Sequence, residues 1–292
     1  MRTVIVTGSA AGIGKETAKL FARKGDRVII ADIDRAGAEA AAAEIKAEHG
    51  HAVPYALDVS SEQQWNDFGQ WVNAEFGCAD VLVNNAGVMD IGGFVETSAD
   101  QWQRTIDIDL MSVVYGSKVF AQQMVDNGMR GHIVNISSGA AFLPSKLISA
   151  YGVAKAAVLM ASQSLRVELR PHGIGVTAIC PGAIRTNLLA HGERHGLVGK
   201  DPEEWREDML AVQSGLAYAG PDKVARVIER AARRNWAIVP VNFEAWLIYG
   251  LIRLSPGLVR WGTSVISFDL LEKLLERARP FVNRLAQRKA KA

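Results

Sequence analysis

The sequence predicts a doubly wound α/β domain, in which a parallel sheet carries helices on both faces. Short apolar runs alternate along the chain with longer segments of helical periodicity. The first apolar run is followed at once by a glycine-rich turn and a helical segment. The chain has 292 residues, of which 49% are hydrophobic, and this is enough for one such domain with a large core.

Composition and charge exclude several classes of protein. The formal net charge is +2, from 33 basic and 31 acidic residues, so the chain has no global attraction for nucleic acid. Cys78 and Cys180 are too few for a disulfide framework and match no metal-ligand spacing. The first apolar run begins at Val4 and meets a glycine turn within a few residues, which is unlike a signal peptide. We therefore expect a cytoplasmic protein.

A glycine turn follows the first predicted strand, residues 3–8. Gly8, Gly12 and Gly14 lie where the strand must turn sharply, admit a phosphate close to the backbone and start a helix. The helix then continues to residue 25. This pattern predicts a nucleotide pyrophosphate site, and on the motif alone a purely structural turn of small residues remains the alternative.

The second predicted strand, residues 27–32, ends at Asp32. A carboxylate in this position accepts hydrogen bonds from both hydroxyls of an adenosine ribose and repels a 2′-phosphate, which favours NAD over NADP. Asp32 and Asp34 both precede an alanine-rich helix, so an N-cap role is the alternative. Arg35 adds a complication, because a nearby cation could neutralise a 2′-phosphate.

The fourth predicted strand, residues 79–87, ends in two adjacent amides, Asn84 and Asn85. Two buried amides need hydrogen-bond partners, and we expect a strand end beside a nucleotide to supply them. The third strand, residues 51–59, ends near Asp58, for which capping of the next helix is one interpretation.

A tyrosine and a lysine four residues apart, Tyr151 and Lys155, form the strongest chemical signal. In a helix this spacing puts both side chains on one face, where the ammonium stabilises a phenolate and lowers the pKa of the phenol. Tyr151 could then accept a proton near neutral pH. Ser138 follows an apolar run at residues 132–137, so its hydroxyl would lie at the end of a strand and could hold a substrate oxygen. Taken alone, the pair could also be an ordinary solvated helix face.

Together these motifs resemble the short-chain dehydrogenase/reductase family over about residues 3–240. The matching segments are the TGxxxGxG turn at 7–14, NNAG at 84–87, Ser138 with Tyr151 and Lys155, and a Pro-Gly turn at 181–182 followed by Thr186. The resemblance implies a Rossmann-type sheet of seven parallel strands, completed by strands at 174–182 and 236–241. It also implies an NAD-dependent oxidoreductase that interconverts a hydrophobic secondary alcohol and its ketone, and a homo-oligomer.

The resemblance assigns roles to individual residues. Ser138 would orient the substrate oxygen, Tyr151 would take its proton, and Lys155 would lower the pKa of Tyr151 and hold the ribose. Asp58 would face the adenine amino group, and Ala11 is not the basic residue that NADP-preferring members often carry there. The residues implied in cofactor binding are Gly8, Ser9, Gly12, Ile13, Gly14, Asp32, Ile33, Asp58, Val59, Asn85, Ala86, Gly87, Tyr151, Lys155, Pro181, Gly182, Ile184 and Thr186.

One position departs from the family pattern. In the predicted helix at 102–124, Asp109 stands where the family has an asparagine that holds a water bonded to the active-site lysine. A carboxylate keeps the acceptor role, loses the amide donor and favours the ammonium form of Lys155, which weakens the effect of Lys155 on Tyr151. We therefore place Asp109 with the catalytic residues. The alternative is an ordinary helix-face charge, with Ser112 or another group in its role.

Residues 187–218 match the position of the family's mobile substrate lid. His191, Glu193 and His195 lie in this segment, but the rest of a coordination shell is missing, so we expect no metal site. We assign residues 1–242 to the catalytic domain. The same fold could also serve a catalytically silent, nucleotide-binding regulatory protein or a membrane-peripheral protein, and the joint presence of Ser138, Tyr151 and Lys155 argues against both.

Residues 243–292 extend beyond the family core as an amphipathic helical extension. The apolar part is interrupted by Arg253, Pro256 and Arg260, so it cannot form a membrane-spanning helix. A basic amphipathic segment follows at 270–292. Three interpretations stay open for the extension: contact with a membrane surface, contact with another subunit, and a cover over the substrate pocket.

Overall fold

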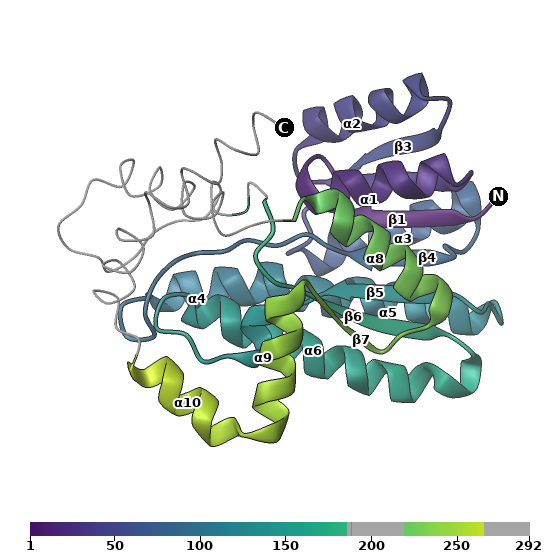
Figure 1. The fold of residues 1–292 in the computed structure, drawn as a ribbon. Helices are drawn as coiled ribbons and strands as arrows, with labels where there is room; N and C mark the ends of the chain where they lie inside the picture. Colours follow the sequence, from purple (N-terminus) through teal and green to yellow (C-terminus); the bar gives the residue numbers. More distant parts are fainter. Residues whose placement is uncertain (186–187, 189–218, 266–292) are drawn as a thin grey trace, which may run out of the picture.

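The computed structural model describes residues 1–185, 188 and 219–265. They form one sheet of seven parallel strands in the order β3-β2-β1-β4-β5-β6-β7, with helices on both faces (Figure 1). The predicted doubly wound, seven-stranded fold is thus confirmed. The strands are β1 (Thr3–Thr7), β2 (Arg27–Asp32), β3 (His51–Ala56), β4 (Val81–Asn84), β5 (His132–Ile136), β6 (Gly175–Pro181) and β7 (Ile238–Val241).

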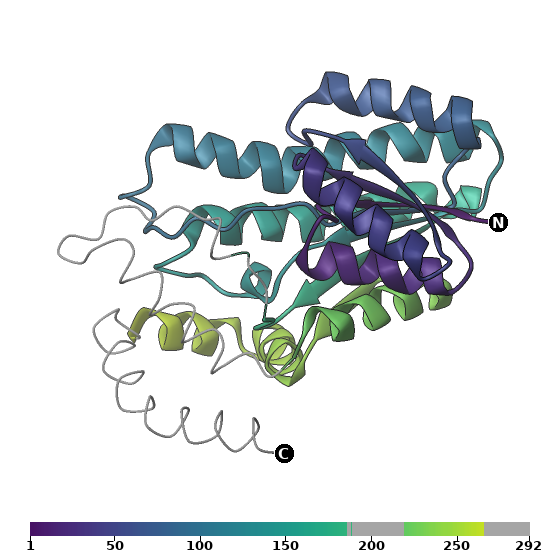
Figure 2. The ribbon, with the colours of Figure 1, turned by 90° about the horizontal axis from the view of Figure 1, so that it is seen from above.

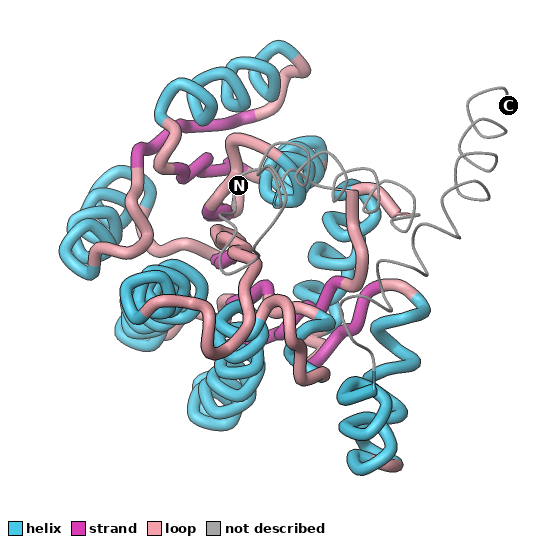
Figure 3. Tube along the Cα trace, turned by 90° about the vertical axis from the view of Figure 1, so that its left-hand side faces the viewer, coloured by secondary structure: helices cyan, strands magenta, loops and turns pink. Residues whose placement is uncertain are grey.

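Two helical layers enclose the sheet, as Figures 2 and 3 show from two further directions. One layer packs on a cluster of small and aliphatic side chains, and its helices are α1 (Gly12–Arg23), α2 (Arg35–Ala47) and α8 (Pro221–Arg234). The other packs on a cluster with large aromatic rings, and its helices are α3 (Glu62–Phe76), α5 (Ser112–Asp126) and α6 (Ser149–Leu169). Further elements are α4 (Ala99–Ile106) and 3₁₀ turns at Gly139–Phe142 and Arg170–His172.

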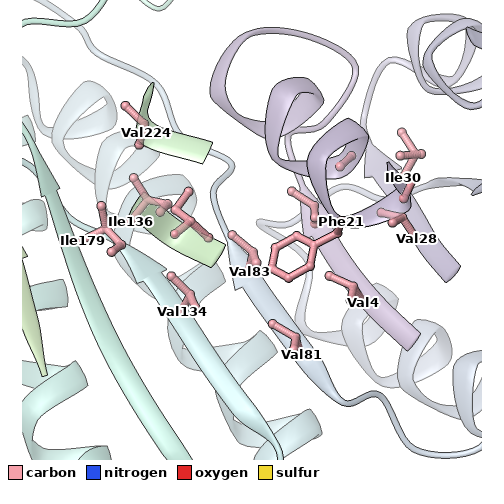
Figure 4. Packing of buried hydrophobic residues seen from close by; sticks show 14 of the residues in the cluster. Val4, Phe21, Val28, Ile30, Val81, Val83, Val134, Ile136, Ile179 and Val224 are labelled. Atoms are coloured by element: carbon pink, nitrogen blue, oxygen red, sulfur yellow. The ribbon is translucent and has the colours of Figure 1, made fainter. Parts of the chain in front are cut away.

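The two cores explain why the strands read as nearly continuous apolar runs. A strand in a parallel sheet is covered on both faces, so its side chains are buried whichever way they point. Figure 4 shows the first core, where Phe21 of α1 packs over Val4 and Val83. In the second core the fully buried rings of Trp65, Phe68 and Phe120 meet edge to face.

The chain order reverses in the middle of the sheet, between β1 and β4. From β1 the chain builds outward to β2 and β3, then crosses back to β4 and builds toward β7. All the strands are parallel, so their carboxyl ends lie along one edge. Open α/β sheets bind ligands at such a reversal, because the loops leave it in opposite directions and open a crevice.

The segment predicted as one helix, residues 102–124, contains a π-helical turn. α4 ends at Ile106, the π turn spans Asp107–Met111, and α5 begins at Ser112. Asp109 is fully buried in this turn and accepts a hydrogen bond from the backbone N–H of Val88 (2.9 Å). Such turns recur at functional sites, because the wider turn re-aims a side chain.

Two helices follow β7, α9 (Phe243–Leu254) and α10 (Pro256–Val265). The chain enters α9 through Asn242, whose φ of +80° lies in the left-handed region. α9 packs on the molecule through the buried Ala245 and through Tyr249, whose ring lies 5.0 Å from that of Phe142. Among the described helices none is long and apolar enough to cross a membrane. Residues 266–292, which include the basic segment, lie outside the described residues.

His132, the first residue of β5, is a buried neutral imidazole. Its Nε2 lies 2.8 Å from the hydroxyl oxygen of Thr177, and that hydroxyl donates to the carbonyl of Trp236, so Nε2 is the donor. A β-carbon at Gly175 would overlap Nδ1, because the backbone closes over this nitrogen. Burial, with the nearby Arg166, lowers the pKa of His132 to about 4.

This histidine should make the fold sensitive to acid. A lowered pKa means that the stabilising neutral form is fully present above the unfolded-state pKa of 6.5 and is lost as the pH falls toward about 4. We expect the wild type to lose about 3 kcal/mol of unfolding free energy across this range relative to His132→Gln, as measured by urea denaturation. The exposed His172→Gln should leave the dependence unchanged; equal pH dependence in the wild type and His132→Gln would contradict the assignment.

Candidate active site

The glycine turn lies between β1 and α1 and brings its backbone close to β4. Gly8 and Gly12 have φ values of +62° and +57°, which favour glycine over any residue with a side chain. A β-carbon at Gly14 would overlap the carbonyl oxygen of Gly8. No side chain caps the start of α1, so within the described structure its first backbone N–H groups face the turn without a side-chain acceptor.

Asp32 lies at the end of β2 and is oriented by the glycine turn. Its Oδ2 accepts a hydrogen bond from the N–H of Ala10 (2.9 Å), and its Oδ1 accepts one from the N–H of Asp34 (3.0 Å). Asp34, not Asp32, caps α2 by accepting from Gly37 (3.0 Å). Each oxygen of Asp32 keeps acceptor capacity for a further donor. Ile33 follows with 72% of its surface exposed.

Asp58 lies at the expected edge of the sheet but does not cap the next helix. It lies after β3 at the same edge as Asp32, and its Oδ1 accepts from the N–H and hydroxyl of Ser60 (3.0 and 2.7 Å). Ser61 is the residue that caps α3. The neighbouring Val59 and, in the glycine turn, Ser9 are buried.

The amides at the end of β4 find their partners at neighbouring strand ends inside the protein, as expected. Asn84 donates to Ser117 (3.2 Å) and to Asn135 of β5 (2.8 Å). Asn85 donates to the carbonyls of Thr7 (2.8 Å) and Gly8 (3.1 Å). The amides therefore tie β4 to both neighbouring strands.

Ser138, Tyr151 and Lys155 come together at the ends of β5 and α6. The side chain of Ser138 hydrogen-bonds to Tyr151, and Tyr151 and Lys155 are 6% and 3% exposed. The ammonium of Lys155 lies 5.6 Å from the centre of the Tyr151 ring and donates to the carbonyl of Ile136 (3.3 Å). The hydroxyl of Ser138 also accepts from the N–H of Ala140 (3.1 Å), which fixes its direction.

The π turn brings Asp109 into this group. Its Oδ1 lies 3.5 Å from the ammonium of Lys155, and Gly87 lies against the pair. A β-carbon at Gly87 would lie 2.7 Å from Oδ1 and 3.3 Å from the ammonium, so a glycine lets the two charges approach. Oδ2 is buried and has no hydrogen-bond partner among the described residues.

The electrostatics of Tyr151 differ from the sequence-based expectation. Burial is the largest effect and raises the pKa of the phenol, the carboxylate of Asp109 raises it further, and Ser138 lowers it. Lys155 was expected to lower this pKa, and Asp109 was expected to weaken that effect. The carboxylate of Asp109 lies 3.5 Å from the ammonium of Lys155 and offsets its charge.

A mainly apolar cavity of about 380 Å³ opens beside Ser138. The turn after β6, with Pro181 and Gly182, forms one wall, and α9 and α10 form another. The apolar and hydroxyl side chains that line it include Leu143, Leu147, Ile148, Ala245, Ile248 and Thr263. The extension is therefore part of the pocket wall along its described length.

Sequence reasoning did not identify Glu244 and Ile248 as site residues. Glu244 accepts a hydrogen bond from the N–H of Ala183 (3.1 Å), directly after the Pro-Gly turn, and Ile248 faces the cavity one helical turn later. Their spacing on one helix face is the only signal in the sequence. Ile184 is buried near the turn. Thr186 and the histidines of the predicted lid lie outside the described residues.

Comparisons with known proteins agree with this geometry. A family model described as short chain dehydrogenase matches residues 2–195. The probable oxidoreductase EphD of Mycobacterium tuberculosis is 44% identical over 259 residues, which cover 88% of this chain and 44% of EphD. This chain thus spans less than half the length of that relative.

Two further proteins match along nearly their whole length. The galactitol 2-dehydrogenase of Agrobacterium fabrum is 36% identical over 80% of this chain and 97% of its own. A short-chain dehydrogenase/reductase of Burkholderia phymatum, solved in complex with NAD, is 24% identical and shares the fold with a TM-score of 0.80, over 89% of this chain and 95% of its own. The chain belongs to the short-chain dehydrogenase family, whose members are oxidoreductases that act on CH–OH groups with a nicotinamide cofactor.

Proposed function

We propose that this chain is an NAD-dependent oxidoreductase that interconverts a hydrophobic secondary alcohol and its ketone. The observation that carries the proposal is the meeting of Ser138, Tyr151 and Lys155 beside an apolar cavity, at the edge of the sheet that also carries the glycine turn. A proton-transfer group, a positioning hydroxyl and a buried cation next to a hydrophobic pocket suit the oxidation of an apolar alcohol.

The residues present fit a dinucleotide. The crowding at Gly14 makes a tight cradle, and the uncapped start of α1 offers N–H groups to a pyrophosphate. Asp32 presents a carboxylate for the adenosine ribose, and Arg35 is engaged with Glu39 (3.0 Å) on the exposed side of α2. The charge at this corner therefore favours NAD. When bound, the nicotinamide supplies the hydride acceptor or donor.

The protein's own side chains would orient the substrate and transfer its hydroxyl proton. Ser138, held by Ala140, would direct the substrate oxygen toward Tyr151. Tyr151 would take the hydroxyl proton during oxidation and return it to a carbonyl oxygen during reduction. Lys155, anchored by the carbonyl of Ile136, would bind the nicotinamide-side ribose and stabilise the phenolate.

The relatives and the cavity together bear on which class of substrate this chain binds. Galactitol 2-dehydrogenase is named for a polyol, whereas the cavity here is mainly apolar, although Lys146 and Glu244 also line it. An apolar wall binds hydroxyl-rich substrates poorly, because their hydroxyls would lose hydrogen bonds to water. We therefore favour a small hydrophobic alcohol or ketone.

A silent, nucleotide-binding regulatory role is the alternative from another class. Such a protein would need the glycine turn and Asp32 but not a buried Tyr-Lys pair. Burying Lys155 costs free energy unless the ammonium is compensated, and the protein supplies both Asp109 and the carbonyl of Ile136 for this purpose. The presence of this compensated cation supports catalysis.

We also propose a homo-oligomer, formed through α6. Val153, Met160 and Val167 lie at intervals of seven residues along this helix and are 48%, 63% and 75% exposed. A stripe of apolar side chains on one helix face is suited to pack against the same helix of a second copy.

The activity test is a screen of hydrophobic secondary alcohols and their ketones with NAD and NADP. The wild type should turn over with NAD in preference to NADP. Asp32→Ala should bind NAD more weakly and show a smaller preference for NAD over NADP, because the 2′-phosphate of NADP is no longer repelled. Equal or better use of NADP by the wild type would contradict the cofactor assignment.

Tyr151→Phe is the control for the chemistry in this screen. It removes one hydroxyl and keeps the ring, so binding of NAD followed by fluorescence should persist while turnover falls by about a hundredfold or more. Wild-type turnover in Tyr151→Phe would exclude the proposed site.

The outward face of α9 and α10 is a candidate for peripheral contact with an anionic membrane. Trp246, Leu254 and Leu258 are 53%, 86% and 57% exposed, and Arg253 and Arg260 lie among them. An exposed apolar strip with interspersed arginines suits the boundary between headgroups and acyl chains.

Two variants test the roles of the outer and inner faces of the extension separately. Leu254→Asp combined with Leu258→Asp should abolish sedimentation with vesicles of equal parts phosphatidylcholine and phosphatidylserine at low salt, and it should leave turnover unchanged. Ile248→Trp on the inner face should keep vesicle binding and raise KM, because the larger ring enters the cavity. Val95→Asp, at an exposed residue outside these helices, is the matched control. If the wild type ignores vesicles and the double variant lowers the oligomeric mass, the face is a subunit contact.

A further inference from the structure

We propose that Asp109 raises the pH at which Tyr151 changes from proton donor to proton acceptor, by offsetting the charge of Lys155. Asp109 acts through Lys155, so it is a positioning residue. The effect of Asp109 on catalysis rests on the proposed function. The effect of Asp109 on the ionisation of the Tyr151 phenol does not.

The geometry makes Asp109 the counter-charge of Lys155. Its carboxylate is fully buried, and Oδ1 is fixed between the N–H of Val88 at 2.9 Å and the ammonium of Lys155 at 3.5 Å. Gly87 is the residue that lets this approach occur, because any β-carbon there would intrude on both groups. The second oxygen, Oδ2, has no partner in the described part of the chain, so the lysine takes most of the neutralising role.

An offset cation cannot stabilise a phenolate as a lone cation would. In a poorly polarisable interior a single ammonium near a phenol favours the phenolate strongly, whereas a close ion pair presents the phenol with two opposed fields. Tyr151 is buried as well, and burial itself disfavours its charged form. The phenol therefore remains protonated to a higher pH than a lone Lys155 would allow.

The other groups around Tyr151 leave this balance unchanged near neutral pH. Ser138 on the β5 side is uncharged, and the Cys180 thiol in β6 stays protonated because burial raises its pKa to about 12. Asp90 is buried near Asp109, but Arg104 pairs with both of its oxygens (3.2 and 2.9 Å). Asp109 and Lys155 are thus the two groups that decide the field at the phenol.

Asp109 itself titrates near neutral pH. Burial raises the pKa of its carboxyl to about 6, against the opposing effect of Lys155. Above about pH 6 the carboxylate is charged and opposes the ammonium; below that pH it is neutral and the ammonium acts alone. A variant without the charge should therefore differ from the wild type above about pH 6 and converge with it below.

The test replaces the carboxylate with its isosteric amide, Asp109→Asn, in the full chain. Tyrosinate absorbance is titrated in the wild type and in the variant, and the signal of Tyr151 is isolated by subtracting the matching titration on a Tyr151→Phe background. The variant should show about tenfold more Tyr151 phenolate at any pH on the rising limb, a shift of roughly one unit to lower pH. In the pH profile of kcat/KM for alcohol oxidation, the limb that reports the ionisation of Tyr151 should move to lower pH by the same amount.

Asp107→Asn is the matched control, because it removes the same charge from the same π turn. Asp107 is only half-buried and accepts a hydrogen bond from Gln103 (2.8 Å), so removal of its charge should leave the titration of Tyr151 unchanged. Asp109→Thr serves as a second neutral variant if the asparagine variant does not fold. Superimposable titrations of the wild type and a folded neutral variant would overturn the inference.

The spectroscopic titration needs no substrate, so the two proposals can fail separately. A shifted titration without turnover of any alcohol would reject the proposed function and support the role of Asp109. Turnover with unshifted titrations and unshifted pH profiles would support the proposed function and reject the role of Asp109.

Discussion

The hydrogen bonds made by the two amides at the end of β4 hold the candidate site together. Asn84 reaches β5 through Asn135 and α5 through Ser117, while Asn85 reaches the carbonyls of Thr7 and Gly8. These contacts lie where the chain order of the sheet reverses, and they join the half that carries the glycine turn to the half that carries Tyr151. Two strands that separate at a reversal leave backbone groups unpaired, and side-chain amides can satisfy them without closing the crevice.

The cost of burying charge dominates the half of the candidate site that carries Tyr151 and Lys155. Lys155 and Asp109 are both almost fully buried, and each gives the other the counter-charge that the interior lacks. The π turn and Gly87 are the structural means by which the pair forms. The same arrangement moderates the influence of the lysine on Tyr151, so the structural solution to burial also adjusts the chemistry of the phenol.

Periodicity and turn requirements predicted a doubly wound parallel sheet and the glycine turn, while the family resemblance implied the seven strands and the joint site of Ser138, Tyr151 and Lys155. The π turn was not predictable, since a shift of one hydrogen bond around Asp109 leaves the apolar pattern of a helix intact. The direction of the pKa shift of Tyr151 depends on burial, which arises only when β5, β6 and α6 pack. The wall formed by Ile248 depends on the tertiary path of the chain after β7, and the composition of that segment left three interpretations open.

The central claim is that one dinucleotide spans the crevice from Asp32 to Tyr151. A crystal structure of the full chain with NAD tests it most directly. The account predicts an adenosine ribose bound to the carboxylate of Asp32, a pyrophosphate against the turn at Gly12 and Gly14, and a nicotinamide-side ribose in contact with Tyr151 and Lys155. A dinucleotide bound with its adenosine away from Asp32, or with its nicotinamide away from Tyr151, would contradict it.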